Sequence, residues 1–435
     1  MAAQMSLFAV TGRPILHSLS PALFNGYFQK HSLPFHYGRL AADSAGESLE
    51  LFRGIGLKGM NVTAPFKTEI LPLLNELDDA ARRIGAVNTV LAEGAELKGY
   101  NTDYLGISGA LDSRGVDVLG RTCLVVGAGG AGRAAVYALV QKKAKVILLN
   151  RDISKARQVA RTLACETAGL EDFRSLVPVA EVIVLAVPSE AVPLEGVPFR
   201  PGQTILDADY RGGRGKRGVK DEGIRYIGGQ EWLIFQAVPS LALFIGKKAP
   251  ALSMDWPAEA GRGSSRKGKA VALVGFMGSG KTTVGKVLAA RLGYDFVDTD
   301  ERIEHLAGKS IRDIFRSEGE PRFRRMEKEL LGRLASKDKV VLACGGGAVA
   351  DEESRALLRD RALVVWLYAS PETSLSRIDT SLRPLLDHPE PVSRGRELFG
   401  QRLGSYFRAA DLVVGSELAA DRTIEKIHEE IRLAL

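Results

Sequence analysis

A glycine-rich stretch around residue 278 carries the clearest chemical pattern in the sequence. Residues 275–283 read GFMGSGKTT and fit the phosphate-binding pattern G-x-x-x-x-G-K-[ST]. Glycines let backbone N–H groups turn toward phosphate oxygens, and the start of the following helix adds the positive end of its dipole. In this pattern Lys281 reaches the β- and γ-phosphates, and the Thr282 hydroxyl binds Mg²⁺. The ATP contacts predicted here are Gly278, Ser279, Gly280, Lys281, Thr282 and Thr283.

Two carboxylates follow this loop. Asp298 and Asp300 close a run at residues 296–300 that predicts the end of a strand, and residues two apart on a strand face the same way. One carboxylate is suited to Mg²⁺, and the other can accept a hydrogen bond from a substrate hydroxyl. The predicted metal ligands are Thr282 and Asp298, and the residues alone leave the role of Asp300 open.

Polar side chains also recur at the ends of predicted strands in the first hundred residues. Singly, an Asn or Thr is most often a turn former, and Ser20 before Pro21 is typical of a helix start with serine as N-cap. Together they gather where α/β folds place ligand sites. A lysine near a carbonyl can donate a proton as hydride reaches carbon, and a neighbouring carboxylate fixes its position and charge. The set is Ser18, Ser20, Asn61, Thr63, Lys67, Asn88 and Asp103.

A second glycine-rich motif lies in the middle of the chain. Residues 127–132 read GAGGAG and fit G-x-G-x-x-G. The motif follows an apolar run at 122–126, opens a helical segment at 133–142 and precedes an apolar run at 145–149, which is the βαβ context of dinucleotide binding. Such glycines admit a pyrophosphate to the helix N-terminus. The predicted contacts are Gly127, Ala128, Gly129, Gly130, Ala131 and Gly132.

The residues after the last of these runs indicate which dinucleotide binds. NAD enzymes place Asp or Glu there for the ribose 2′-hydroxyl, whereas this chain has Asn150 and Arg151. An arginine without that acid favours a 2′-phosphate, and therefore NADP. Asp152 puts an anion near the proposed phosphate, which Lys155 offsets. We predict NADP(H) bound by Asn150, Arg151 and Lys155, with the strictness over NAD left open.

Composition bounds the kind of protein. The chain is 45% hydrophobic and 26% charged, which is typical of soluble globular proteins, and its net charge is +7. Its length of 435 residues predicts two or three domains. No apolar run could span a bilayer, residues 1–10 do not resemble a secretory signal, and three scattered cysteines predict a reducing cytoplasm. Basic clusters at 211–220 and 262–269 lack interleaved aromatics, so we predict solvated loops. Small-molecule substrates are the expected partners, without nucleic acid or membrane.

Four motifs in the N-terminal part carry a specific resemblance. They are G-x-P-I-x-H-S-x-S-P from Gly12, N-V-T-x-P-x-K from Asn61, G-A-x-N-T from Gly85 and G-x-N-T-D from Gly99. In this order and with similar gaps, they make residues 5–246 resemble the shikimate dehydrogenase family. The resemblance implies that Lys67 and Asp103 form the catalytic pair of a ketone reduction. The substrate contacts that it implies are Ser18, Ser20, Asn61, Thr63, Lys67, Asn88, Asp103, Tyr210 and Gln236.

The chain departs from that family at two places near the cofactor. Residues 186–189 read AVPS where the family has an N-A-T stretch, and a basic loop after residues 207–210 replaces a T-P-L segment. Neither change touches the proposed catalytic pair. They leave an alternative open, in which the dehydrogenase part is a binding module that is catalytically impaired or uses quinate.

A second resemblance covers residues 270–415. The motifs are D-x-D at 298–300, F-R-x-x-E at 323–327, G-G-G at 345–347 and R-P-L-L at 383–386, and together they are similar to those of the shikimate kinase family. The resemblance implies that Lys281, Asp300 and Arg383 take part in phosphoryl transfer, Arg383 from a lid segment. Arg377 would lie against adenine. The implied shikimate contacts are Asp300, Arg324, Glu327, Gly345, Gly346, Gly347 and Arg402.

These observations predict an α/β protein with two enzymatic halves. The parts are a substrate domain (1–106 with a closing helix at 231–248), a Rossmann NADP-binding domain (107–230), a tether (249–268), and a P-loop domain like nucleoside-monophosphate kinases (269–435). The predicted function is NADPH-dependent reduction of 3-dehydroshikimate to shikimate, followed by phosphorylation of shikimate with ATP and Mg²⁺ to shikimate 3-phosphate. The sequence leaves open the oligomeric state, channelling and the relative orientation of the halves.

Overall fold

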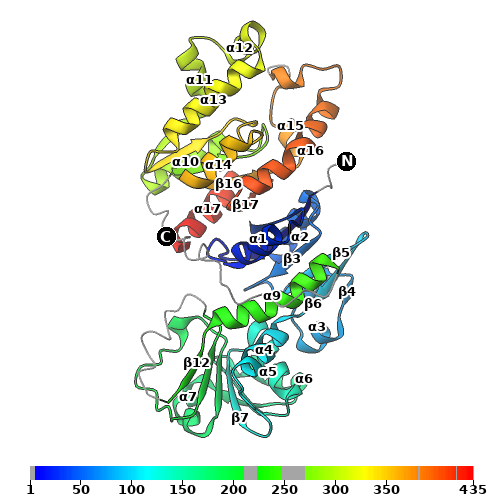
Figure 1. Ribbon diagram of the computed structural model, residues 1–435, viewed down its shortest axis with the longest axis vertical. Helices are drawn as coiled ribbons and strands as arrows, with labels where there is room; N and C mark the ends of the chain where they lie inside the picture. Colours follow the sequence, from blue (N-terminus) through cyan, green and yellow to red (C-terminus); the bar gives the residue numbers. More distant parts are fainter. Residues whose placement is uncertain (1–4, 210–222, 247–269, 381–382, 418, 435) are drawn as a thin grey trace. The chain divides into compact units, whose positions relative to one another are not determined.

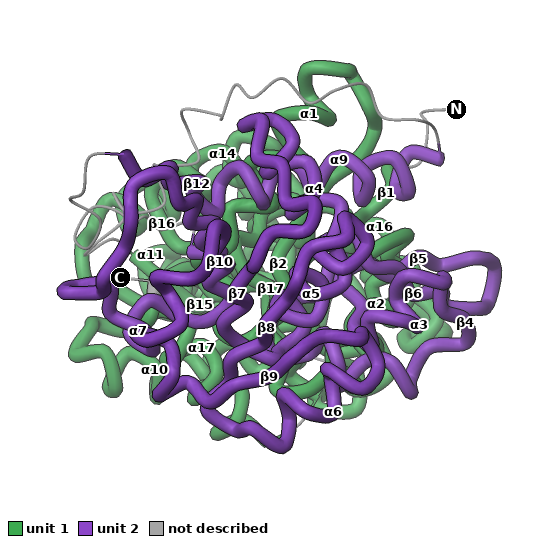
Figure 2. The backbone as a smooth tube through the Cα atoms, turned by 90° about the horizontal axis from the view of Figure 1, so that it is seen from below, with its two compact units in different colours: residues 1–60, 256–435 green, residues 61–255 purple. Residues whose placement is uncertain are grey.

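The computed structural model describes residues 5–209, 223–246, 270–380, 383–417 and 419–434 (Figure 1). The chain forms two compact units (Figure 2). One unit combines residues 1–60 with residues 256–435, and the other consists of residues 61–255. Segments from both ends of the sequence therefore fold together. The functional domains proposed from the sequence follow a different division and stay predictions.

A parallel sheet with surrounding helices forms the C-terminal part of the first unit. Its strands, in spatial order, are β14 (Asp295–Asp298), β15 (Val340–Ala343), β13 (Ala270–Val274), β16 (Ala362–Tyr368) and β17 (Leu412–Gly415). Its helices are α10 (Lys281–Leu292), α11 (Thr299–Ala307), α12 (Ile311–Glu318), α13 (Glu320–Leu334), α14 (Glu352–Arg361), α15 (Pro371–Ser376), η7 (Pro384–Leu386), α16 (Pro391–Ala409) and α17 (Ala420–Ala434). Every residue of β13 and β15 is buried, as expected for central strands of a parallel sheet.

The N-terminal segment adds strands to this sheet. β2 (Phe35–Ala41) pairs in parallel with β17, so that Val413 lies opposite Leu40. β1 (Ser6–Gly12) pairs with β2 along its whole length. The two helices of the segment are α1 (Ser20–Lys30) and α2 (Ala45–Ile55). The strand order therefore runs from β17 through β2 to β1, which joins the first and last parts of the chain.

The second unit holds a parallel sheet of Rossmann type, as predicted. Its strands, in spatial order, are β12 (Arg225–Ile227), β11 (Thr204–Asp207), β10 (Val182–Leu185), β7 (Thr122–Val126), β8 (Lys145–Asn150) and β9 (Glu166–Gly169). The helical segments beside it are α5 (Gly130–Gln141), α6 (Ile153–Leu163), η2 (Leu170–Asp172), α7 (Phe173–Leu176), η3 (Val177–Val179) and η4 (Ser189–Ala191). Alternate residues of β7 enter opposite cores, with Val125 in one cluster and Leu124 in the other.

A smaller group of elements completes the second unit. β5 (Thr89–Glu93) and β6 (Glu96–Tyr100) form the predicted antiparallel hairpin. The others are β3 (Gly59–Val62), which begins in the first unit, η1 (Leu71–Leu73), β4 (Glu76–Leu77), α3 (Asp79–Ile84), α4 (Asp103–Ser113) and α9 (Gly229–Ile245). Helix α9 packs on α4 because Gly106 leaves room there for Trp232.

Two predicted local features are wrong. Ser20 is not the N-cap of α1: the helix begins at Ser20, and the capping position is Leu19, whose backbone is already helical. Asp300 is not at a strand end, because β14 stops at Asp298 and Asp300 lies in the first turn of α11. The cause is the Asp298 side chain, which accepts a hydrogen bond from the backbone N–H of Asp300 at 3.0 Å and so starts the helix.

Some sequence predictions fall where the structure gives no description. Tyr210, both basic clusters and the tether at 249–268 lie outside the described residues. Within the described part of the chain, none of the helices combines the length and apolar character needed to cross a membrane. The cysteines Cys123, Cys165 and Cys344 are free thiols.

Candidate active sites

The phosphate-binding loop joins β13 to α10 in the first unit. Gly278 and Gly280 have φ angles of 81° and 87°, which residues with a side chain rarely adopt. Helix α10 starts after Gly280 without a side-chain cap, so its first N–H groups suit an anion. The Lys281 ammonium donates to the carbonyls of Gly275 (3.0 Å) and Phe276 (2.8 Å), which holds it across the loop. The loop fits the phosphates of a nucleotide.

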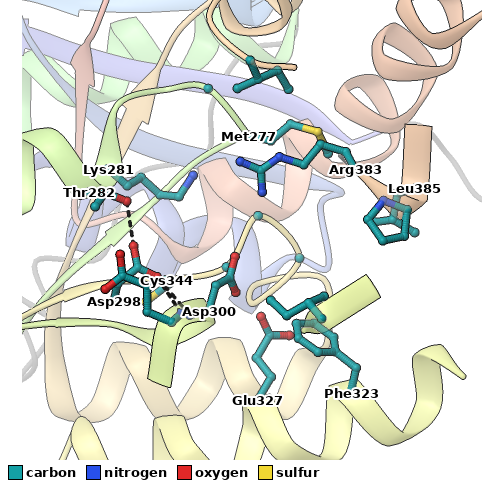
Figure 3. A pocket seen from close by; sticks show the side chains of 18 of the residues that line it. Met277, Lys281, Thr282, Asp298, Asp300, Phe323, Glu327, Cys344, Arg383 and Leu385 are labelled. Carbon is teal, nitrogen blue, oxygen red and sulfur yellow. Dashed lines mark hydrogen bonds between the residues drawn. The ribbon is translucent and has the colours of Figure 1, made fainter. Parts of the chain in front are cut away.

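Two cations extend toward one another across the cavity in front of this loop. They are Lys281, from the start of α10, and Arg383, just before η7 (Figure 3). The pKa of Lys281 is lowered to about 8, chiefly because the ammonium is buried; Arg383 adds to this shift, and Asp300 and Asp298 oppose it. An anion between the two cations favours their charged forms. The pair therefore suits the charge on a transferring phosphoryl group.

The two residues predicted for Mg²⁺ lie together. The Thr282 hydroxyl donates to Asp298 Oδ2 at 2.6 Å (Figure 3). Hydroxyl and carboxylate oxygens fit the preference of Mg²⁺ for oxygen ligands. The described residues contain no group of three His, Cys, Asp or Glu side chains that could bind a metal without help. The ion would thus take further ligands from phosphates and water, as Mg²⁺ does in kinases.

A cavity of about 730 Å³ gathers the predicted kinase residues. Those that line it are Gly278, Gly280, Lys281, Thr282, Thr283, Asp298, Asp300, Arg324, Glu327, Gly345, Gly346, Gly347, Arg377, Arg383 and Arg402. Ser279 is not among the lining residues, because its side chain is fully buried beside Gly275. The cavity lies within the first unit.

Two buried carboxylates in this cavity each keep an unsatisfied oxygen. Among the described residues, Asp300 Oδ1 and Glu327 Oε1 have no hydrogen-bond partner. Burial raises the pKa of both carboxyl groups, although neighbouring cations oppose this. Gly345 lies beside them, and a Cβ atom there would be 2.6 Å from Asp300 Oδ1. A ligand that carries several hydroxyl donors would satisfy both oxygens.

Arginines of the cavity are held in place while donors remain for a ligand. Arg324 donates from Nη1 to Glu327 Oε2 at 2.7 Å and from Nε and Nη2 to Glu320 Oε1, which leaves one N–H on each terminal nitrogen. Arg402 Nη1 donates to the Gly346 carbonyl at 3.1 Å. A guanidinium has five N–H donors and matches a carboxylate in a bidentate way. Arg377 is tied by both terminal nitrogens to backbone carbonyls of residues 416 and 417. The arrangement suits an acidic polyol beside a nucleotide.

In the second unit, Lys67 and Asp103 form a buried ion pair. The Lys67 Nζ and Asp103 Oδ2 atoms are 2.6 Å apart. The Lys67 side chain is 14% exposed and the Asp103 side chain 6%. Asn88 Nδ2 donates to the other oxygen, Asp103 Oδ1, at 2.9 Å, and the Thr102 N–H donates to Asn88 Oδ1 at 2.7 Å. Asp103 is the first residue of α4, where the helix dipole favours an anion. The lysine is therefore fixed and can deliver a proton at one place.

A polar network extends from this pair to helix α9. Asn88 Nδ2 lies 3.0 Å from Gln236 Oε1, and Asn61 Nδ2 donates to Thr89 Oγ1 at 2.9 Å and to Ser240 Oγ at 3.1 Å. Ser240 was not among the predicted residues, although it follows Gln236 by four residues and so shares its helix face. Arg312 and Phe315, which line the kinase cavity from α12, were likewise not predicted as site residues.

The remaining predicted substrate contacts lie in different units. Ser18 and Ser20 are buried in the first unit, where the Ser18 N–H donates to the Ile15 carbonyl at 2.9 Å. Thr63 is half-buried directly after β3, in the second unit. Each is described within its own unit, and their shared role stays a prediction.

The dinucleotide loop lies beside the lysine. Helix α5 begins after Gly129 without a side-chain cap, which suits a pyrophosphate. Gly132 contacts the carbonyl of Gly127, where a side chain would not fit. A Cβ atom on Gly130 would lie 2.7 Å from the Lys67 Cβ. The loop thus fits a dinucleotide and brings it next to the proposed proton donor.

Asp152 has a structural task that explains its presence. It caps α6: its Oδ1 accepts from the backbone N–H groups of Ser154 (3.0 Å) and Lys155 (3.2 Å). Asn150 Oδ1 accepts from the Ala128 N–H at 3.2 Å, which ties the end of β8 to the glycine loop. Arg151 is exposed. Since the Asp152 charge is directed at a helix N-terminus, it opposes a 2′-phosphate less than the sequence suggests.

Comparison with known families matches both parts of the chain. Family models described as "Shikimate dehydrogenase substrate binding domain", "Shikimate / quinate 5-dehydrogenase" and "Shikimate kinase" match residues 10–90, 111–196 and 277–432. A shikimate dehydrogenase (NADP(+)) of Syntrophobacter fumaroxidans is 34% identical over 260 residues, covering 57% of this chain and 90% of the relative.

Further relatives agree. A shikimate kinase of Symbiobacterium thermophilum is 44% identical over 164 residues, covering 37% of this chain and 92% of the relative. The crystal structure of shikimate dehydrogenase from Aquifex aeolicus superposes with a TM-score of 0.53 at 32% identity, over 60% of this chain and 99% of that one. Both resemblances and the predicted fold class are confirmed. The chain therefore belongs to the shikimate dehydrogenase family through its N-terminal part and to the shikimate kinase family through its C-terminal part.

Proposed function

We propose that this chain catalyses two consecutive reactions, reduction of 3-dehydroshikimate to shikimate with NADPH and phosphorylation of shikimate with ATP and Mg²⁺. The observation that supports this most strongly is that one chain carries both a fixed buried Lys–Asp pair beside a dinucleotide loop and a phosphate-binding loop facing unsatisfied carboxylates. The product of the first site is the substrate of the second. A catalytically impaired dehydrogenase part is not favoured, because the Lys67–Asp103 pair is intact and the glycine loop proposed for the dinucleotide lies directly beside it.

In the reduction, Lys67 is the proton donor. NADPH, when bound, supplies the hydride that reaches the carbonyl carbon. Lys67 gives a proton to the carbonyl oxygen, so that the ketone becomes a secondary alcohol and the lysine is left neutral. Asp103, whose second oxygen is held by Asn88, keeps the lysine in position for the transfer.

In the phosphorylation, positioning and charge neutralisation do most of the work. Lys281 and Arg383 would stabilise charge on the γ-phosphoryl group, and Thr282 with Asp298 would hold Mg²⁺. Asp300 Oδ1 accepts a hydrogen bond from the substrate hydroxyl that attacks phosphorus. Arg324 and Arg402 would bind the substrate carboxylate with their remaining donors.

A coupled assay tests the proposal. Purified protein is given 3-dehydroshikimate and NADPH, then ATP and Mg²⁺, while NADPH absorbance and ADP are followed. We expect NADPH loss first and ADP only after shikimate has formed. If ADP arises from added shikimate while NADPH stays constant, the dehydrogenase assignment is wrong. A parallel series with quinate and NADP⁺ measures use of that substrate.

The setting of these reactions stays a prediction. Their substrates are small molecules, and we propose the cytoplasm as the location because three free cysteines suit a reducing compartment. Measured redox state of the thiols in cell extract and cell fractionation would check it.

A further inference from the structure

The last helix of the kinase part contacts the loop that carries Ser18. This loop follows β1 and includes residues 13–19. Glu430, on α17, is only 2% exposed. Its carboxylate accepts hydrogen bonds from the backbone N–H groups of Ile15 (2.9 Å) and Leu16 (2.8 Å). A buried carboxylate bound to backbone N–H groups is a strong, directional attachment. Removing it leaves the buried Ile15 N–H and the partly buried Leu16 N–H without this partner.

The attachment reaches Ser18 in one further step. The Ser18 N–H donates to the carbonyl of Ile15, so the residue that Glu430 binds also fixes the backbone at Ser18. The Ser18 carbonyl accepts from Arg39 Nη2 at 2.7 Å, and Arg39 Nη1 donates to the Asp411 carbonyl at 3.3 Å. Ser18 is therefore held on two sides by groups that lead to the kinase part.

Other contacts also join the kinase part to the N-terminal segment. Lys426, 4% exposed on the same helix, contacts Glu47 and lies 3.3 Å from Asp43. Gly38, on β2, leaves room for the Phe407 ring, since a Cβ atom there would be 2.8 Å from it. Charge pairing, strand pairing and close packing thus coincide within the first unit.

We propose that Glu430 is a positioning residue for the dehydrogenase reaction. By fixing Ile15 and Leu16 it sets the backbone at Ser18, whose hydroxyl accepts from the Ser20 N–H at 3.4 Å, and thereby the affinity for 3-dehydroshikimate. Glu430 belongs to the kinase part, so a residue of the kinase part then affects substrate binding in the dehydrogenase reaction. The inference rests on the proposed role of the two serines.

Full-length variants test this. We expect Glu430→Ala to raise the KM for 3-dehydroshikimate about tenfold, because two charge-assisted bonds are lost, with kcat and the KM for NADPH changed less than about twofold. Glu430→Gln keeps one acceptor oxygen and should give a smaller rise. Glu425→Gln removes the same charge from an exposed position of α17 and should match the parent. Kinase constants should stay unchanged in all three.

The outcomes separate the explanations. An unchanged KM for 3-dehydroshikimate in both Glu430 variants overturns the proposal. A parallel fall of kcat in both reactions, together with a lower Tm, also overturns it, since Glu430 would then serve only folding. If Glu430→Ala does not fold, the KM of Glu430→Gln decides. A parent protein without NADPH turnover contradicts the proposed function itself, and the inference falls with it.

Discussion

The charged groups of the site around Lys67 bind one another, whereas the cavity around Lys281 contains polar atoms that lack a partner among the described residues. Both oxygens of Asp103 are bound, one to Lys67 and one to Asn88. In the kinase cavity, Asp300 and Glu327 each keep a buried oxygen without a described partner, and the Lys281 ammonium rests on carbonyls. A group that moves one proton has to be fixed beforehand, whereas a site that binds a highly charged nucleotide is completed by its ligands.

The largest effect is expected from removing Lys281, the lysine proposed to bind the phosphates. Lys281→Ala should lower kinase kcat by about 10³-fold or more, because a charge on the transferring group loses its nearest cation. Dehydrogenase turnover in the same protein should be unchanged. The ADP and NADPH assays measure both. The matched control is Lys286→Ala, which removes an exposed lysine from the same helix. A kinase loss below tenfold would contradict the role given to Lys281.

Removing Lys67, the proposed proton donor, should lower the dehydrogenase activity and leave the kinase activity unchanged. Lys67→Ala should lower dehydrogenase kcat by about 10²- to 10⁴-fold, as expected for a lost general acid. Kinase constants should remain those of the parent. Lys142→Ala breaks an exposed pair with Asp112 and serves as the control, since such pairs contribute little. Equal losses in the two lysine variants would exclude Lys67 as the donor.

The comparison predicts opposite stability changes for two aspartates. Asp103→Asn leaves a largely buried ammonium unpaired and should cost about 3 kcal/mol of unfolding free energy. Asp300→Asn should instead add about 1 kcal/mol at neutral pH, because burial raises the pKa of Asp300 and its ionised form is unfavourable. Urea denaturation of both variants without ligand measures the difference. Stabilisation by the Asp103 change would reverse the comparison.

The sign of the pH effect follows from that raised pKa. The unfolded chain releases the Asp300 proton at lower pH than the folded chain, so parent stability falls as pH rises between the two values. The advantage of Asp300→Asn should therefore vanish below the unfolded pKa of an aspartate. Kinase activity of the parent should fall as Asp300 becomes protonated, at a higher pH than for an ordinary aspartate. An identical pH profile in Asp300→Asn would contradict this.

The smallest effects concern cofactor choice. Arg151→Ala should raise the KM for NADPH about tenfold with little change for NADH, if the guanidinium binds the 2′-phosphate. Asp152→Ser keeps a helix cap and removes the charge, so it should change NADPH preference less than about threefold. Initial rates with both dinucleotides measure this. A large gain in NADPH preference on removing the Asp152 charge would mean that its carboxylate faces the phosphate after all.

Several strands could be predicted from the sequence because their apolar runs end at glycines. The strands at 122–126 and 270–274 have the predicted bounds, and each leads into its glycine loop. Lys281 and Thr282 were placed by local spacing alone. Asp300 was misplaced because a side-chain cap at Asp298 outweighs strand alternation, and nothing in the neighbouring residues specifies which of the two prevails.

Contacts between residues far apart in the chain could not be predicted from local sequence patterns. The pairing of β17 with β2 joins strands far apart in the chain, and the residues of a strand do not indicate which distant strand will lie beside it. Glu430 and Lys426 have the residue types of a solvated helix face, yet both are buried against the N-terminal segment. Only the folded arrangement reveals that they act as partners of Ile15 and Glu47.

The pairing of β2 with β17 also bears on how this protein can be produced. An unpaired strand edge offers open N–H and C=O groups to any other chain and is a route to aggregation. Here β2 has β1 and β17 as neighbours, and β17 has β16 and β2, so each strand closes the edge of the other. Cutting the gene between the two parts would uncover both edges, so poor solubility of the separate products, relieved by expressing them together, is the expected outcome.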